Sequence, residues 1–227
     1  MSDDLQLLWF TLGTASLATA LIFPFGVLAG AGLARWRGPG SGLVETALSL
    51  PLVLPPTAVG MVLLELLGRK FGLGQALDAA GLDVVYTWKA VVLASAVMGF
   101  PLLVRSARSA FEGVDPRLAG ISRTLGRGRV QTFLRVSLPL SWRGVLAGAV
   151  LAFSRALGEF GATFLVAGNI PGRTQTLALA IFQRVQLGED AAAFRLVALT
   201  TALAFAAIWV TERVTRRRPA PAGKGAG

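Results

Sequence analysis

Long stretches without charged residues constrain this chain more than any other feature of its sequence. The first runs from Leu5 to Ala34, and these 30 residues contain no Asp, Glu, Lys or Arg. About 20 apolar residues are enough for a helix to cross the hydrocarbon core of a bilayer, whereas a soluble helix of this length needs a polar face. Because 54% of the 227 residues are hydrophobic and the mean hydropathy is +0.64, we predict an all-α membrane protein.

Four further apolar stretches predict additional membrane spans. They occupy residues 46–64, 90–104, 142–167 and 195–212. The segments 68–89 and 168–193 are predicted to be loops on one side of the membrane, with a short amphipathic helix over 176–185 at the surface. We therefore expect about five transmembrane helices in one domain, residues 1–218, followed by a disordered tail at 219–227 that is rich in Pro, Ala and Gly.

The distribution of Lys and Arg predicts which ends of the spans face the cytoplasm. Two follow the first span, eight lie from Arg105 to Arg143, and five lie from Arg213 onward, together 15 of 22. Lys and Arg accumulate in the cytoplasmic segments of membrane proteins. This bias predicts an N-terminus outside and a C-terminus in the cytoplasm. It also explains the net charge of +10 by topology, so no binding of nucleic acid is expected.

Missing residue types exclude several kinds of chemistry. The chain contains no His, the commonest metal ligand and general base, and no Cys, which excludes disulfides, thiolate catalysis and zinc–thiolate sites. It also has no G-x-x-x-x-G-K-[ST] loop for nucleotide phosphates. We therefore expect no catalytic residue, metal or cofactor in this chain. Energy for any transport would have to come from a partner or a gradient.

One polar and basic segment, residues 112–139, interrupts the apolar stretches and is predicted to lie at the cytoplasmic surface. Asp115-Pro116 is typical of a helix start, with Pro at the first helical position. Gly126 then interrupts the helix, and Leu138-Pro139 is expected to close the segment before the next span. The pattern predicts two short helices joined by a glycine turn. From charge alone, a basic loop that rests on anionic lipid headgroups is an equal alternative to a docking element.

From Gly126 to Pro139, a glycine is followed by nine residues, an aliphatic residue, any residue and Leu-Pro. This spacing resembles the EAA loop of ABC importer permeases. The resemblance implies a coupling helix that docks into a groove on a separate ATPase subunit. The front of the motif departs from the family, because residues 120–122 stand where the family has Glu-Ala-Ala. The residues implied for ATPase coupling are Gly120, Ser122, Arg123, Thr124, Leu125, Gly126, Leu138 and Pro139.

Two features inside the predicted spans are candidates for a translocation path. Pro55 and Pro56 free backbone carbonyls, which a membrane tolerates only where they are buried in protein or line a cavity; a kinked packing helix is an equal alternative. Arg155 and Glu159 are one turn apart, and their pairing without net charge favours a packing role over an anion gate. The candidate path or gate residues are Pro55, Pro56, Thr57, Arg155, Glu159 and Thr163.

Longer stretches resemble molybdate ABC transporter permeases. They are SLPLVLPPTAVG at 49–60, VMGFPLLVRSAR at 97–108 and SRALGEFGATFLVAGNIPGRTQT at 154–176. The LGEFGA segment is shared with sulfate and thiosulfate permeases. The resemblance implies a type I ABC importer permease fold in the bacterial inner membrane and transport by alternating access. It also implies a homodimer, a pair of ATPase subunits that bind ATP and magnesium, and an extracytoplasmic molybdate-binding protein.

Other functions remain open at this point. A sulfate/thiosulfate or tungstate permease would have the same architecture. A gradient-driven transporter or channel would lack the ATPase partner. A scaffold role would not account for the spacing from Gly126 to Leu138-Pro139. A membrane-embedded enzyme would require an acid–base or metal cluster, and without His or Cys the chain offers only dispersed carboxylates.

Overall fold

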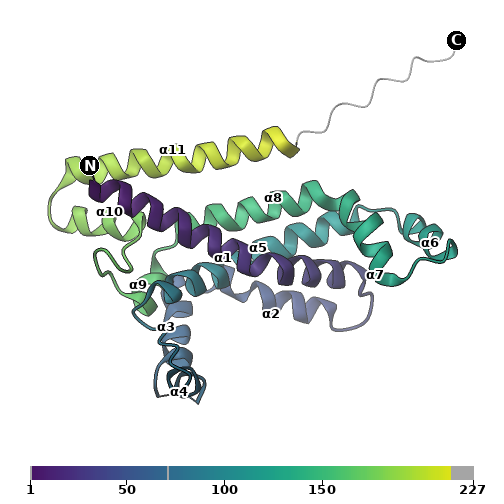
Figure 1. Ribbon diagram of the computed structural model, residues 1–227, viewed down its shortest axis with the longest axis horizontal. Coiled ribbons are helices and arrows are strands. Elements are labelled where there is room, and N and C mark those ends of the chain that lie inside the picture. Colours follow the sequence, from purple (N-terminus) through teal and green to yellow (C-terminus); the bar gives the residue numbers. More distant parts are fainter. Residues whose placement is uncertain (1, 71, 216–227) are drawn as a thin grey trace, which may run out of the picture.

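A computed structural model describes residues 2–70 and 72–215, and all regular elements in these ranges are helices. In chain order the elements are α1 (Ser2–Arg35), α2 (Ser41–Val53), α3 (Pro56–Leu67), α4 (Gly72–Ala79), α5 (Trp88–Glu112), α6 (Pro116–Thr124), α7 (Arg129–Thr132), the π-helical turn η1 (Phe133–Ser137), α8 (Leu138–Leu157), α9 (Gly161–Ala167), α10 (Leu177–Gln186) and α11 (Asp190–Thr215). The long helices run along one axis (Figure 1). The segment 113–137 between α5 and α8, called the α6–α7 loop, lies at one end, and α9, α10 and the N-terminus lie at the other.

Four helical segments are long and apolar enough to cross a membrane. They are Asp3–Arg35, Trp88–Glu112, Arg129–Leu157 and Asp190–Arg213. The pair α2 and α3 is apolar enough to form a fifth span but is bent by 105°. The bend lies where Pro55 precedes Pro56, the first residue of α3, because neither proline has an N–H to continue the helix. Four or five spans confirm the predicted all-α membrane architecture.

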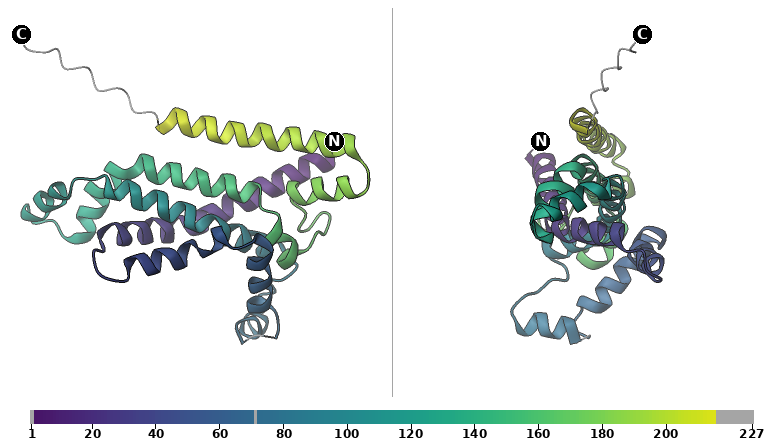
Figure 2. Two further views of the ribbon diagram at one scale, coloured as in Figure 1. Left: turned by 180° about the vertical axis from the view of Figure 1, so that it is seen from behind. Right: turned by 90° about the vertical axis from the view of Figure 1, so that its right-hand side faces the viewer.

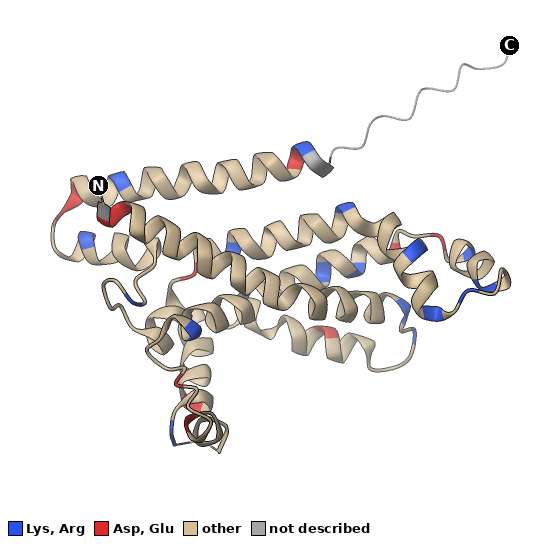
Figure 3. Ribbon diagram, in the orientation of Figure 1, with Lys and Arg blue, Asp and Glu red and all other residues tan. Residues whose placement is uncertain are grey.

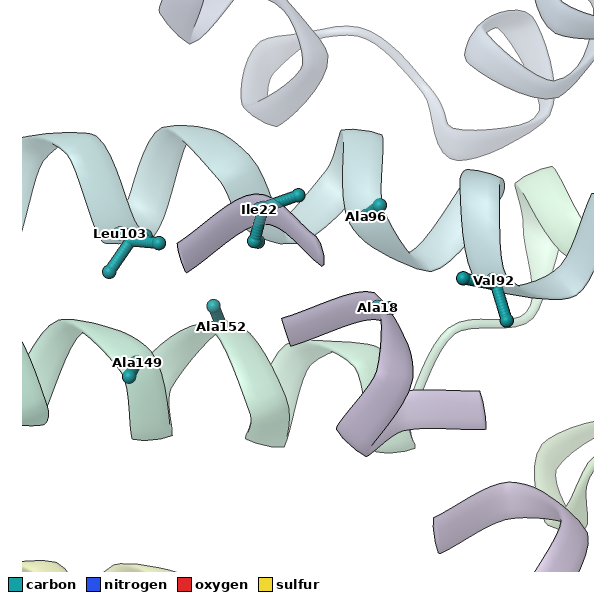
Figure 4. Packing of buried hydrophobic residues seen from close by; sticks show 7 residues of the cluster. All are labelled: Ala18, Ile22, Val92, Ala96, Leu103, Ala149 and Ala152. Carbon is teal, nitrogen blue, oxygen red and sulfur yellow. The ribbon is translucent and has the colours of Figure 1, made fainter. Parts of the chain in front are cut away.

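The core of the bundle lies where α1, α5 and α8 pack together. Its largest cluster consists of small and aliphatic side chains from these three helices. These are Ala18, Ile22, Val92, Ala96, Leu103, Ala149 and Ala152 (Figure 4). Alanines let helix backbones approach closely, which favours van der Waals packing between membrane helices. The helix α11 lies at one edge, and the arm formed by α3 and α4 projects from the bundle (Figure 2).

The segment 112–139 does not end before the next span, contrary to the prediction from Leu138-Pro139. Instead, α7, η1 and α8 form one continuous helical segment. The π-helical turn accounts for this continuity. The N–H of Leu138 donates to the carbonyl of Phe133, five residues back, and this wider turn lies just before Pro139, which has no N–H to donate.

The apolar stretches mark the spans but not all of their ends. The third span continues to Glu112, well beyond the predicted end at 104. The predicted outer loop 68–89 contains the helix α4, and the fourth stretch breaks after Leu157 into α8 and α9. The amphipathic helix predicted over 176–185 is confirmed as α10. The predicted tail at 219–227 lies outside the described residues.

Candidate functional site

The α6–α7 loop is built from capping interactions that its sequence encodes. The carboxylate of Asp115 accepts a hydrogen bond from the Arg117 N–H at 2.8 Å and caps the start of α6. At the other end, Gly126 has φ of +81°, and the Arg127 N–H donates to the Ser122 carbonyl at 3.2 Å. This is the Schellman arrangement that ends a helix on a left-handed glycine. The predicted helix start and glycine turn are thereby confirmed.

A buried hydrogen bond joins the two arms of this loop. The hydroxyl groups of Ser122 and Thr132 lie 3.1 Å apart, and these residues are only 5% and 1% exposed. Ser122 was predicted to take part in ATPase coupling, but its side chain points between α6 and α7. It therefore fixes the shape of the loop and presents no hydroxyl to a partner.

The outer face of α6 carries an exposed apolar stripe. Leu118, Ile121 and Leu125 are 41%, 56% and 74% exposed and follow the i, i+3, i+7 spacing of one helix face. The adjoining turns add Val130 and Leu134, which are also exposed. Figure 3 shows Lys and Arg along the same loop. Exposed apolar side chains on a charged segment mark an interaction surface.

The docking residues predicted from the sequence divide between two faces of α6. Leu125 belongs to the exposed apolar stripe, and Thr124 is exposed next to it. Gly120 and Arg123 are also exposed but line a cavity of about 610 Å³ between α6 and the ends of α1 and α5. The apolar members of the stripe were not predicted, except Leu125. The i, i+3, i+7 spacing of Leu118, Ile121 and Leu125 is the sequence signal that indicates a shared helix face.

Two candidate path segments that are far apart in the sequence meet where α3 packs on α9. A Cβ atom added to Gly161 would lie 2.9 Å from the Pro56 Cβ and 3.2 Å from the Thr57 amide nitrogen. A Cβ atom added to Gly60 would lie 2.7 Å from the Ala162 Cα. The two helices are therefore in backbone contact, which glycine alone permits at these positions. Pro55, Pro56 and Thr57 remain exposed on this junction.

Arg155 and Glu159 form the predicted ion pair, although no continuous helix connects them. The distance from Arg155 Nη1 to Glu159 Oε2 is 2.6 Å, across the break between α8 and α9. The second carboxylate oxygen, Oε1, accepts a hydrogen bond from the Ala162 N–H at 2.8 Å at the start of α9. The Glu159 side chain is 1% exposed, whereas that of Arg155 is 26% exposed. Glu159 therefore holds the two helix ends together, and Arg155 is the accessible half of the pair.

The last candidate path residue, Thr163, is fully buried in α9. Its hydroxyl has no hydrogen-bond partner in the part of the chain that the structure describes. In the same part, no group of three or more acidic side chains is placed to hold a metal ion. Together, the apolar spans, the bent α2–α3 pair and the exposed stripe on a polar loop define a multi-pass membrane protein with an exposed apolar interaction surface.

Comparison with known proteins identifies the family. The family described as "Binding-protein-dependent transport system inner membrane component" matches residues 22–218, and the chain belongs to it. It is 43% identical over 218 residues to the Escherichia coli (strain K12) protein named "Molybdenum transport system permease protein ModB", covering 94% of this chain and 95% of that protein. It is 39% identical over 200 residues to the Bacillus subtilis "Putative molybdenum transport system permease protein YvgM", covering 88% of each.

A sulfate permease is also similar, at lower identity. The "Sulfate transport system permease protein CysT" of Salmonella typhimurium is 36% identical over 176 residues, which cover 78% of this chain and 64% of that protein. Among solved structures, the MetNI methionine ABC transporter in inward-facing conformations matches with a TM-score of 0.74 and 16% identity, over 95% of this chain and 96% of that one. This likeness confirms the type I ABC importer permease fold. The chain is thus a multi-pass inner-membrane transport subunit and not an enzyme.

Proposed function

We propose that this chain is the permease subunit of an ATP-driven importer that carries molybdate across the bacterial inner membrane. The observation that carries this proposal is the 43% identity, over nearly the full length, with a protein named as a molybdenum transport permease. Two sulfate permeases match at lower identity, 34% and 36%. Sulfate or thiosulfate is therefore the second candidate substrate, and tungstate is a third.

The proposed assembly contains two copies of this chain, two ATPase subunits that bind ATP and magnesium, and an extracytoplasmic binding protein. The exposed stripe of Leu118, Ile121 and Leu125 supports docking of the α6–α7 loop to the ATPase. The positions of 15 of the 22 Lys and Arg residues support an orientation with this loop in the cytoplasm and the N-terminus outside. Movement of the loop is then transmitted directly, because α7, η1 and α8 form one helical segment.

The proposed path passes the junction of α3 and α9. Pro55, Pro56 and Thr57 lie exposed at this junction, next to the break that Arg155 and Glu159 bridge. The partly exposed Arg155 offers a transient partner to an oxyanion, while the adjacent Glu159 limits how tightly an anion is held. Selectivity then resides mainly in the binding protein, in keeping with the few polar groups of the spans.

The direct test is uptake into proteoliposomes that contain this chain, its ATPase and the binding protein. We expect ATP-dependent uptake of labelled molybdate that resists excess sulfate and is blocked by tungstate. Strong competition by sulfate would assign the chain to the sulfate branch and leave the coupling proposal intact. Uptake without ATP would contradict the coupling proposal itself.

Replacing Gly126 with valine is expected to uncouple ATP hydrolysis from uptake without preventing membrane insertion. A Cβ atom added here meets nothing within 4 Å, but the φ of +81° is unfavourable for any L-residue by about 1–2 kcal/mol and more for a β-branched one. The turn should therefore shift and misplace α6. Gly126→Asn is the matched control, because asparagine tolerates this conformation. Unchanged uptake by Gly126→Val would count against docking.

A further inference from the structure

A cavity of about 940 Å³ lies between α5 and α8 at the end of the bundle that carries the α6–α7 loop. The two helices touch at its floor, where the Ser106 hydroxyl donates to the Gly144 carbonyl at 2.9 Å. A Cβ atom on Gly144 would lie 2.5 Å from the Ala110 Cβ, so the floor requires glycine. Longer side chains on both helices form the walls. The result is a cavity that neither α1 nor α11 lines.

The middle of this cavity, at the level of the Ser106–Gly144 contact, is positively charged, and its lining lacks acidic groups. Arg105 and Arg143 line it, both are exposed, and no Asp or Glu is among its lining residues. Neither guanidinium forms an ion pair with any residue of 2–70 or 72–215. The contrast with Arg108 is clear, because that side chain is paired with both Glu45 and Glu112. Two cations are thus available here to an anion.

The cavity becomes apolar on both sides of this level, with Val114 and Leu140 in the part nearest the loop and Leu102 and Leu151 in the part farthest from it. Leu102 lies one turn from Arg105 on α5, and Leu151 lies two turns from Arg143 on α8, a rise of about 12 Å. Leu151 is 51% exposed. The guanidinium of Arg143 lies 5.7 Å from the ring centroid of Trp142, which is itself 43% exposed. Trp and Arg side by side are typical of the interface between headgroups and hydrocarbon.

We propose that this cavity binds one anionic phospholipid. The headgroup phosphate lies between Arg105 and Arg143, with the exposed Ser109 hydroxyl as a further donor, and an acyl chain follows Leu102 and Leu151. Basic pockets between membrane helices bind anionic headgroups in this way. Two other ligands fit the cavity less well. A free phosphate ion would leave the apolar part unoccupied, and a zwitterionic lipid would place its own positive charge next to two arginines. The bound lipid would join α5 and α8, the two helices between which the α6–α7 loop is inserted.

The test is a lipid titration of the purified transporter complex in detergent, with retained lipid counted by native mass spectrometry. Phosphatidylglycerol is the probe, phosphatidylcholine is the zwitterionic comparison and inorganic phosphate is the chain-free competitor. We expect Arg105→Gln and Arg143→Gln each to weaken phosphatidylglycerol binding about fivefold, and the double variant to weaken it further. Arg129→Gln is the matched control, since Arg129 is exposed at the same end but lines none of these cavity walls. It should bind phosphatidylglycerol as the unaltered complex does.

A second variant tests the apolar part without changing charge. Ala147→Phe should fill the cavity next to Leu151 and lower phosphatidylglycerol retention while both arginines remain. Equal retention of phosphatidylglycerol by the double arginine variant, or equal affinity for phosphatidylcholine, would overturn the proposal. So would displacement of the lipid by equimolar inorganic phosphate. Cross-linking of Leu151→Cys between two copies would show that a second copy covers the cavity instead. None of these outcomes depends on which oxyanion is transported.

Discussion

Replacing Arg155 with glutamine while Glu159 is kept is expected to lower the free energy of unfolding by about 3–5 kcal/mol. The reason is the unequal burial of the pair, because the Glu159 side chain is 1% exposed and that of Arg155 is 26% exposed. Without its partner, the carboxylate stays buried as an uncompensated charge. Replacing Glu159 with glutamine while Arg155 is kept should lower the free energy of unfolding less. Glutamine at 159 can still accept the hydrogen bond from the Ala162 N–H, and the partly exposed Arg155 can turn towards a more polar environment.

The double variant Arg155→Gln/Glu159→Gln is expected to be more stable than Arg155→Gln alone, because it removes the uncompensated charge. The measurement is a double-mutant cycle on denaturant unfolding in mixed micelles, with uptake assayed in parallel. Additive losses would contradict the pairing. If the double variant regains stability but not uptake, Arg155 has a role in the translocation path that is separate from its role in packing.

Replacing Gly60 with valine is expected to have the second largest effect, a loss of about 1–3 kcal/mol together with loss of uptake. A Cβ at this position would lie 2.7 Å from the Ala162 Cα and 2.8 Å from the Ala162 carbonyl oxygen. Both atoms belong to the backbone of α9, so no side chain can rotate away. The helix α9 would have to shift, and the hydrogen bond from the Ala162 N–H to Glu159 would be disturbed.

Gly13→Ala is the control for Gly60→Val. Gly13 also lies within a helix, α1, but an added Cβ there meets nothing within 4 Å. Alanine at 13 should therefore be neutral or stabilising by about 0.5–1 kcal/mol, because it restricts the unfolded chain. The measurement is the thermal unfolding midpoint of each variant in detergent. Equal midpoints for both variants would contradict the close contact between α3 and α9.

The elements that the sequence predicts well are those determined by local chemistry. The run from Leu5 to Ala34 must form a helix in a bilayer, because every backbone N–H and C=O there has to be bonded within the segment. Asp115 and Gly126 specify a helix start and a helix end through their own side chain and backbone. The all-α architecture, four or five spans and the turn inside 112–139 were therefore predictable.

Tertiary structure alone decided which of these local elements meet. Pro55 and Pro56 signal a break, but neither the bend of 105° nor the contact of Pro56 with Gly161 follows from them. The sequence likewise places Ser122 on a helix but does not reveal that Thr132 buries it. Hydrophobicity sorts residues into membrane and water, and capping fixes helix ends within a few residues. The partners of each helix face are chosen by packing between segments far apart in the chain, which no local pattern records.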